Sequence, residues 1–182
     1  NVTHLNTTEE KPVSLNFGGL IGETYGAKFK NDSLVLNVSL KNSNFPQETF
    51  KFGGFVGNAF GKIFVDDVTV SGNIESLEEI FQEEMPYTPI YLGGILGSAD
   101  GDTIIINNAK ISSNFKFSHT NPSELFVGSA IGYVYATTLN MQNVTYDGEI
   151  SFENSSSDNI SLGGFVGIYS TPEYNYNSSS ST

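Results

Sequence analysis

A short glycine motif recurs along this 182-residue chain, and its spacing constrains the fold more than any other feature. The first glycines of successive copies are 35, 40, 35 and 35 residues apart. The copies are Gly18-Gly19-Leu20-Ile21-Gly22, Gly53-Gly54-Phe55-Val56-Gly57, Gly93-Gly94-Ile95-Leu96-Gly97, Gly128-Ser129-Ala130-Ile131-Gly132 and Gly163-Gly164-Phe165-Val166-Gly167. A fixed period of roughly 20 to 50 residues indicates a repeat architecture, in which each unit buries its apolar face against its neighbours.

The repeat extends beyond the motif itself. Eight residues after the first glycine of each of the first four motifs stands a small residue, and three residues later an apolar one. The small residues are Gly26, Gly61, Gly101 and Ala136, and the apolar residues are Phe29, Phe64, Ile104 and Leu139. Agreement at several positions in one frame excludes a chance recurrence of glycine.

Alternating apolar and polar residues follow the motifs, as at 34–40, 63–65 and 68–70. Such alternation, rich in β-branched residues, predicts β-strands with one buried face. Turn-forming pairs separate these segments, namely Asn31-Asp32, Asp66-Asp67, Asn107-Asn108 and Asp147-Gly148. We therefore predict an all-β fold, a β-solenoid similar to a parallel β-helix, with four to five repeats of about 35 residues in a single domain, 1–182.

Glycine at a repeated corner has two physical explanations, and the sequence leaves both open. Glycine permits a positive φ, or it lets one backbone approach the next closely. Ser129 replaces the second glycine of the fourth motif, which predicts a negative φ at that position. A phosphate-binding loop is disfavoured, because no motif ends in Lys-Ser/Thr and because the copies are too many for one nucleotide.

These residues resemble the GLUG-motif repeats of bacterial and eukaryotic-microbe surface proteins, including non-catalytic regions of some immunoglobulin A peptidases. The resemblance covers Gly18 to about Gly167 and departs at Ser129, at Ala136 and in the longer second repeat. It implies a β-solenoid-like extracellular module with an adhesive or structural role. It implies no catalytic residues, because the motif is architectural.

Three segments depart from the repeat body, which spans about 13–169. An insertion at 75–86 accounts for the 40-residue spacing. Ser76 and Glu79 form a capping-box pattern and Pro86 follows, so we expect a short amphipathic helix that covers part of the core or docks a partner. The polar segment 1–12 and the Ser/Tyr/Asn-rich tail 170–182 do not resemble dedicated caps, which leaves the solenoid ends open.

The composition excludes several classes of function. The formal net charge is −12, and all eight basic residues are lysines. Nucleic-acid binding needs clustered basic residues, and a guanidinium clamp needs arginine. With only His4 and His119 and no cysteine, catalytic triads and His- or Cys-rich metal sites lack raw material. We expect no enzymatic activity, no cofactor, no metal, no nucleic-acid partner and no membrane span in this chain.

Asparagine indicates the compartment. Of 19 Asn, eight begin N-x-S/T sequons, about twice the number that the composition predicts by chance. They are Asn1, Asn6, Asn31, Asn37, Asn143, Asn154, Asn159 and Asn177. We therefore expect an extracellular or cell-surface protein that carries N-linked glycans on its lateral surface. The chain opens without an initiator Met or a signal peptide, so we expect a processed product or a fragment.

Two kinds of side chain, carboxylates and tyrosines, are candidates for catalysis or ligand binding. Asp66-Asp67 would point to opposite faces of a strand, and Asp100-Gly101-Asp102 resembles only a weak part of a calcium loop. Five phenylalanines recur at repeat positions and suit a core, namely Phe17, Phe52, Phe55, Phe64 and Phe165. The less regular tyrosines, including Tyr133 and Tyr135, suit a sugar-stacking face or a subunit contact.

The sequence therefore predicts a structural, fibre-forming or surface β-solenoid glycoprotein whose main partner is another copy of itself. The alternative is an adhesin-like module that binds glycans or proteins. A β-helical carbohydrate-active enzyme that uses Asp100 or Asp102 is the least favoured reading.

Overall fold

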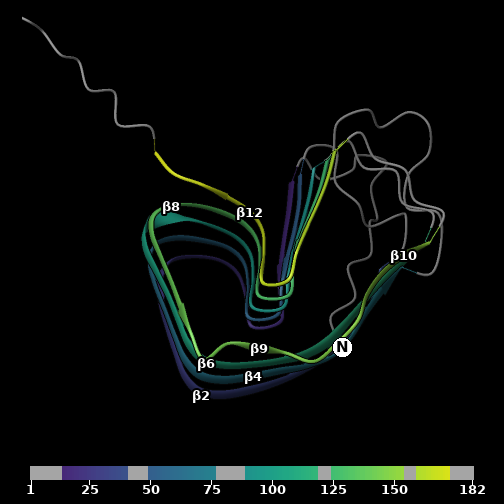
Figure 1. Ribbon diagram of the computed structural model, residues 1–182, viewed down its shortest axis with the longest axis horizontal. Coiled ribbons are helices and arrows are strands. Elements are labelled where there is room, and N and C mark those ends of the chain that lie inside the picture. Colours follow the sequence, from purple (N-terminus) through teal and green to yellow (C-terminus); the bar gives the residue numbers. More distant parts are fainter. Residues whose placement is uncertain (1–13, 41–48, 77–88, 119–123, 154–158, 173–182) are drawn as a thin grey trace, which may run out of the picture.

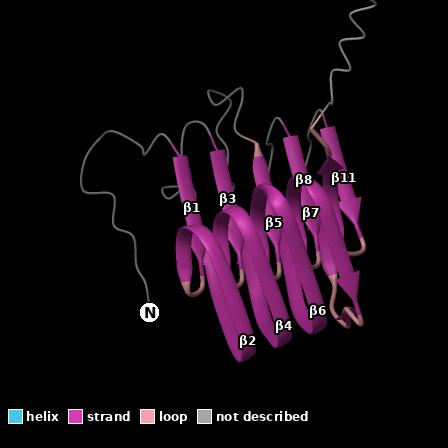
Figure 2. Cartoon of the chain, turned by 90° about the vertical axis from the view of Figure 1, so that its left-hand side faces the viewer, coloured by secondary structure: helices cyan, strands magenta, loops and turns pink. Residues whose placement is uncertain are grey.

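The computed structural model describes residues 14–40, 49–76, 89–118, 124–153 and 159–172 (Figure 1). Within these ranges every regular element is a β-strand. Each turn of the chain begins with a short strand, bends sharply at the glycine motif and continues into a second strand (Figure 1). Successive turns stack with parallel strands (Figure 2), so the chain has the solenoid-like, all-β architecture that its repeat predicts.

The strands fall into two groups around the bends. Before the bends lie β1 (Ser14–Gly18), β3 (Thr49–Gly53), β5 (Ile90–Gly93), β7 (Glu124–Gly128) and β11 (Asn159–Gly163). After the bends lie β2 (Ile21–Leu40), β4 (Val56–Ser76), β6 (Leu96–Ser118), β8 (Ile131–Gln142) and β12 (Val166–Ser170). β9 (Thr145–Tyr146) and β10 (Ile150–Glu153) continue the turn that β8 begins. We name β1 with β2 the first turn, and β11 with β12 the last turn.

Each group forms one parallel sheet. The short strands have the order β1-β3-β5-β7-β11, and the strands after the bends have the order β12-β8-β6-β4-β2, with β9 and β10 also paired to β6. The register aligns the motifs, since Gly18 pairs with Gly53 and Gly128 pairs with Gly163. Equivalent side chains therefore form ladders along the stack, and each turn covers the backbone edge of its neighbour.

Close approach of backbones explains the motif glycines. A Cβ at Gly53 would lie 1.9 Å from the carbonyl oxygen of Val56 and 2.5 Å from the nitrogen of Gly97. The first glycine of every motif has the same contact with the carbonyl three residues later. Positive φ is not the reason, because the described residues adopt it elsewhere. Ser129 is not among the positive-φ residues either, which confirms the φ predicted there.

Positive φ instead marks two other corners, the first of them in the first two turns and the second in the first four. Gly26 and Gly61 adopt φ of 77° and 74°, where the strands of the second sheet shift register. At the next corner stand Asn31, Asp67, Asn108 and Asn143, with φ between 51° and 57°. Asn and Asp tolerate this left-handed conformation better than other side chains, which explains why the repeat places them there.

Two apolar clusters fill the interior. The larger cluster joins bend residues such as Phe55 and Ile95 to the inward side chains of β4, β6 and β8. The smaller cluster packs Phe50, Phe52 and their equivalents in β5 and β7 against Ile74 and Phe115, toward the far ends of β4 and β6. Full burial of each such side chain contributes roughly 1.5–3 kcal/mol, so the inner turns are the stable part of the stack.

Two strands extend by one or two residues into segments that were predicted to lie outside the repeat body. Glu75 and Ser76 belong to β4, where Glu75 pairs with Ser39 and Lys116, so the ladder extends into the predicted insertion. Ser170 ends β12, so the strand pattern continues into the first residue of the predicted tail. The rest of the predicted helix at 75–86, the segment 1–12 and most of the tail lie outside the described residues.

Candidate functional site

The exposed apolar side chains of the described residues concentrate on the first and last turns. Only Tyr135 belongs to a turn between them. The large hydrophobic residues that are exposed are Leu20, Tyr25 and Val35 in the first turn, and Ile160, Leu162, Phe165 and Tyr169 in the last. Tyr25 and Val35 face outward on β2, whereas Leu20 and the four residues of the last turn stand at ladder positions that are buried in the inner turns. Core-type side chains are therefore exposed at both ends of the stack, most of them on the last turn, and exposed apolar patches mark sites of association.

One ladder shows why these side chains are exposed. Leu20, Phe55, Ile95, Ala130 and Phe165 occupy the same motif position. The three inner members are fully buried, whereas Leu20 is 54% and Phe165 40% exposed. These end residues suit a core, but they lack a further turn to cover them.

The short strands give the same picture at the last turn. Ile160 and Leu162 of β11 are 48% and 54% exposed. Their partners in β7, Leu125 and Val127, are almost completely buried. The last turn thus presents three core-type side chains, and its strands β11 and β12 end the two parallel sheets in the part of the chain that the structure describes.

Two tyrosines partly cover the larger core at the same end. Tyr169 stands at the ladder position of Val134, and its hydroxyl donates a 3.1 Å hydrogen bond to the carbonyl of Ala136. Tyr146 packs against the larger core, and its hydroxyl donates a 3.3 Å hydrogen bond to the carbonyl of Ser113. Burial, assisted by the Glu149 carboxylate, raises the pKa of Tyr146 to about 12. The repeat pattern does not predict this partial covering, although bulky tyrosines replace smaller ladder residues there.

A polar and aromatic row connects the two sheets beside the bends. The amide nitrogens of Asn16 and Asn58 donate to one carboxylate oxygen of Glu23, at 2.9 and 3.2 Å. The Lys51 ammonium donates to the Asn58 amide oxygen at 3.2 Å and lies 6.0 Å from the ring centroid of Tyr91. The row ties the short strands to the strands that follow them, with charge and hydrogen bonds balanced internally.

The aromatic half of the row is closely packed. Tyr91 stacks on Phe126 with ring centroids 5.4 Å apart and contacts Tyr133 at 5.2 Å. Burial raises the pKa of Tyr91 and of Tyr133, and nearby carboxylates raise both further. Burial lowers the pKa of Lys51, against the opposing effect of the Glu23 and Asp100 carboxylates. Tyr133 therefore has its ring engaged by neighbours and is a poor stacking platform for a sugar.

An aromatic ladder on the outer side of the same strands is more accessible. Tyr25, Phe60, Asp100 and Tyr135 are in register on successive turns. Tyr25 stacks on Phe60 with ring centroids 4.9 Å apart, and Tyr25 is highly exposed. In this ladder the rings of Tyr25 and Tyr135 are exposed, and Tyr25 has one face covered by Phe60.

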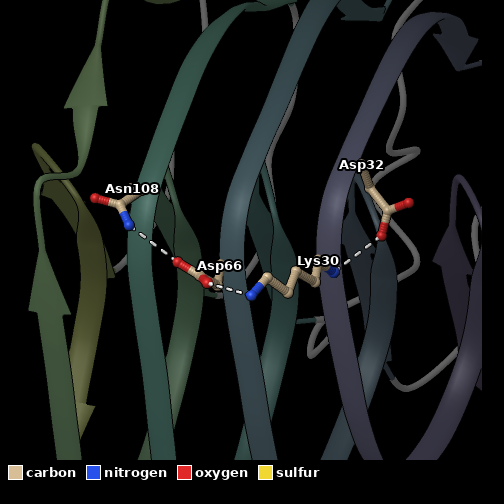
Figure 3. A network of polar contacts seen from close by, with 4 residues as sticks. All are labelled: Lys30, Asp32, Asp66 and Asn108. Atoms are coloured by element: carbon tan, nitrogen blue, oxygen red, sulfur yellow. Dashed lines mark hydrogen bonds and ion pairs between the residues drawn. The ribbon is translucent and has the colours of Figure 1, made fainter.

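The carboxylates do not converge on a reaction centre. Asp66 accepts a 3.0 Å hydrogen bond from the Asn108 amide and lies 3.7 Å from the Lys30 ammonium, while Asp32 accepts from the Lys30 backbone (Figure 3). Asp67 occupies the left-handed corner next to Asp66. Asp100 and Asp102 are both exposed beside Gly101. Among the described residues, no three His, Cys, Asp or Glu side chains are grouped to hold a metal ion.

One open pocket of about 280 Å³ lies near the far ends of β4 and β6. Its polar lining includes Glu75, Lys116 and Glu149. Asn114 donates to the Asn73 amide oxygen at 3.0 Å and accepts from the Glu149 backbone at 2.9 Å. These bonds continue the side-chain ladders of the stack, and they leave no nucleophile paired with a base.

Four of the eight sequon asparagines fall within the described residues, and all four are exposed. Asn31 and Asn37 lie on β2, Asn143 lies between β8 and β9, and Asn159 lies on β11. Asn1, Asn6, Asn154 and Asn177 lie outside the described residues. The described sequons are therefore near the two ends of the stack, rather than spread along its sides.

Comparisons of the chain with protein-family models, curated proteins and solved structures give no match. The resemblance of the glycine motif to GLUG repeats therefore stays a prediction. In the part of the chain that the structure describes, no helix is long and apolar enough to cross a membrane.

Proposed function

We propose that this protein is a structural, fibre-forming or surface subunit that associates end to end through its first and last turns. A single observation carries the proposal: Leu20, Leu162 and Phe165 are 40–54% exposed at positions whose inner equivalents are fully buried. The free edges of parallel sheets are surfaces on which further strands add. Four to five repeats of about 35 residues, as the sequence predicts, make such a subunit a uniform building block.

The proposed location is extracellular or at the cell surface, and the proposed product is a glycoprotein. This part of the proposal is supported by the excess of sequons, by the exposure of Asn31, Asn37, Asn143 and Asn159, and by the GLUG-like motif. Oligosaccharide transfer requires an accessible asparagine, which each of these four residues provides.

Sedimentation velocity across a range of protein concentrations tests the association. We expect the wild-type chain to form concentration-dependent oligomers, which negative-stain imaging shows as short rods. Leu162→Asp places a charge on the last turn, where the side chain is exposed, and should leave a folded monomer. Tyr135→Asp changes an exposed residue on the side of the stack and should still associate. A wild-type chain that stays monomeric at all concentrations refutes the proposal.

An adhesin-like role is the second candidate, and the outer ladder of Tyr25, Phe60, Asp100 and Tyr135 favours it, because the rings of Tyr25 and Tyr135 are exposed. Aromatic faces in a row along a stack suit an extended glycan, because each ring offers apolar area to a sugar face. A glycan array with wild-type protein and with Tyr25→Ala/Tyr135→Ala tests this role. Binding that the double variant loses supports it, whereas an array without binding removes it.

A further inference from the structure

The backbone hydrogen bonds at the bends all point in one direction along the stack. In the first turn, Gly19 donates its N–H to the carbonyl of Gly54 at 2.8 Å, and Leu20 and Ile21 donate to Phe55 at 3.2 and 3.0 Å. The later bends repeat the pattern: Phe55 and Val56 donate to Ile95, Ile95 and Leu96 donate to Ala130, and Ala130 and Ile131 donate to Phe165. Each bend therefore offers donors to the turn that follows it and acceptors to the turn that precedes it.

This polarity leaves the two ends of the stack complementary. No later turn among the described residues accepts from the equivalent N–H groups of the last bend, those of Gly164, Phe165 and Val166. Likewise, no earlier turn in the described ranges donates to the carbonyls of Gly19 and Leu20. A last turn can satisfy a first turn, but two last turns would bring donors against donors.

The second glycine of the motif supports the same geometry. A Cβ at Gly54 or Gly94 would lie 1.9 or 2.2 Å from a carbonyl oxygen of the following turn. At Gly164, a Cβ would meet nothing within 4 Å. The last motif therefore leaves open the space that a following turn occupies elsewhere.

We infer that the partner of the last turn is the first turn of a second copy, stacked head to tail and in register. The inference rests on the proposed function and specifies its contact. Asn159–Ser170 of one copy lie beside Ser14–Tyr25 of the next, so that Ile160, Leu162 and Phe165 meet Leu15, Phe17 and Leu20. Each apolar pair continues a ladder already seen within the chain.

A heterologous contact of this kind does not close on itself. The two surfaces are different, and stacking advances along the solenoid axis, so repeated addition produces an open filament rather than a closed dimer. The polarity of the bends disfavours the symmetric alternative, in which two identical ends face one another and the bend donors meet donors.

Disulfide trapping tests the register, and the chain has no native cysteine to interfere. Tyr25 and Ser170 occupy one ladder position and would be neighbours across the contact. We expect oxidation of a mixture of Tyr25→Cys and Ser170→Cys proteins to yield at least about tenfold more covalent dimer than either protein alone, since adjacent strands lie within disulfide range. A mixture of Tyr25→Cys and Ile168→Cys, two residues out of register, should give little.

The distribution of cross-links separates the possible failures. Efficient dimer formation by Ser170→Cys alone would show a symmetric contact and overturn the inference. Association of the wild-type chain without a cross-link in the mixture would overturn the register but keep the proposed function. A strictly monomeric wild-type chain overturns both.

Substitution of Gly164 provides a test without oxidation. Gly164→Leu fills the open space, so we expect a folded monomer of unchanged thermal stability that no longer associates. Gly164→Ser is the matched control, because Ser129 occupies the same motif position between stacked turns. A Gly164→Leu protein that associates like wild type contradicts the inference. A loss of monomer stability would show that residues of the same chain fill the space, and it too overturns the inference.

Discussion

At the second glycine of the first three motifs, Gly19, Gly54 and Gly94, the backbone of the following turn passes too close for a methyl group. Gly54→Ala would bring a Cβ within 1.9 Å of the Gly94 carbonyl oxygen, and both groups belong to packed backbone. We expect the substitution to lower the free energy of unfolding by about 2 kcal/mol or more, as overpacking of a rigid site does. Urea denaturation of dilute protein measures it. Gly164→Ala is the control, with a change within about 0.5 kcal/mol, since its Cβ meets open space. Equal losses in the two variants would contradict the close-approach explanation.

Tyr146 gives the stability of the monomer a dependence on alkaline pH. Its pKa is raised to about 12 in the folded chain, by burial first and by Glu149 second, against an ordinary value near 10. The unfolded chain therefore loses the phenolic proton first, and stability falls as the pH rises from about 10 to about 12. Urea titrations at several pH values should show a steeper fall for wild type than for Tyr146→Phe. Parallel curves for the two proteins would remove Tyr146 as the cause.

Side-chain hydrogen bonds link the left-handed corner of one turn to the same corner of the next turn. Asn108 donates to Asp66 at 3.0 Å and accepts from Asn143 at 3.0 Å, while its φ is 51°. Asn108→Ala keeps neither the bonds nor an easy left-handed conformation, whereas Asn108→Gly keeps the conformation. We expect the alanine variant to be about 1 kcal/mol less stable than the glycine variant, as measured by chemical denaturation. A more stable alanine variant would show that φ does not limit this corner.

The same corner shows what the sequence could predict about elements. The first three predicted turn pairs contain the corner residues Asn31, Asp67 and Asn108, whereas the corner of the fourth turn is Asn143 and not the predicted pair Asp147-Gly148. The pairs also predicted separate strands at 63–65 and 68–70. The structure has one continuous strand, β4, because a single left-handed residue turns the chain while Asp66 and Val68 on either side stay paired with β6. Alternation of apolar and polar residues predicts which face of a strand is buried. It does not predict whether the pairing of strands stops at a corner.

The polar and aromatic row could not be predicted from local sequence patterns. Lys51 and Asn58 meet because the bend folds one short strand onto the strand that follows it, seven residues further along the chain. Asn16 and Glu23 meet in the same way one turn earlier. The motif spacing predicted ladders between turns, whereas these contacts within a turn required the geometry of the bend.

At the scale of the whole molecule, the sequons divide the chain into ends and a middle. Four of the eight precede residue 38, four follow residue 142, and none lies between. The sequons predict glycans on the lateral surface of the stack, and the four described sequons lie on or beside the end turns. The apolar ends and the glycan acceptors therefore occupy the same regions, and we propose that glycosylation controls the association.

Asn159 and Asn37 allow this control to be tested separately. Asn159 lies on β11, in the proposed contact, where it would neighbour Ser14 of the next copy. Within the chain, Ser14 and Thr49 on that ladder already form a 2.9 Å hydrogen bond, so neighbouring side chains touch there. A glycan on Asn159 would crowd this position, whereas Asn37 lies on β2 beyond the contact.

For protein secreted from a glycosylating host, we expect Asn159→Gln to lower the dissociation constant of the association roughly tenfold, equivalent to about 1.4 kcal/mol. Asn37→Gln should change it much less, and sedimentation velocity compares the two. Equal changes of the dissociation constant in the two variants would show that the glycan on Asn159 does not affect assembly. A weaker association of Asn159→Gln would contradict the contact itself.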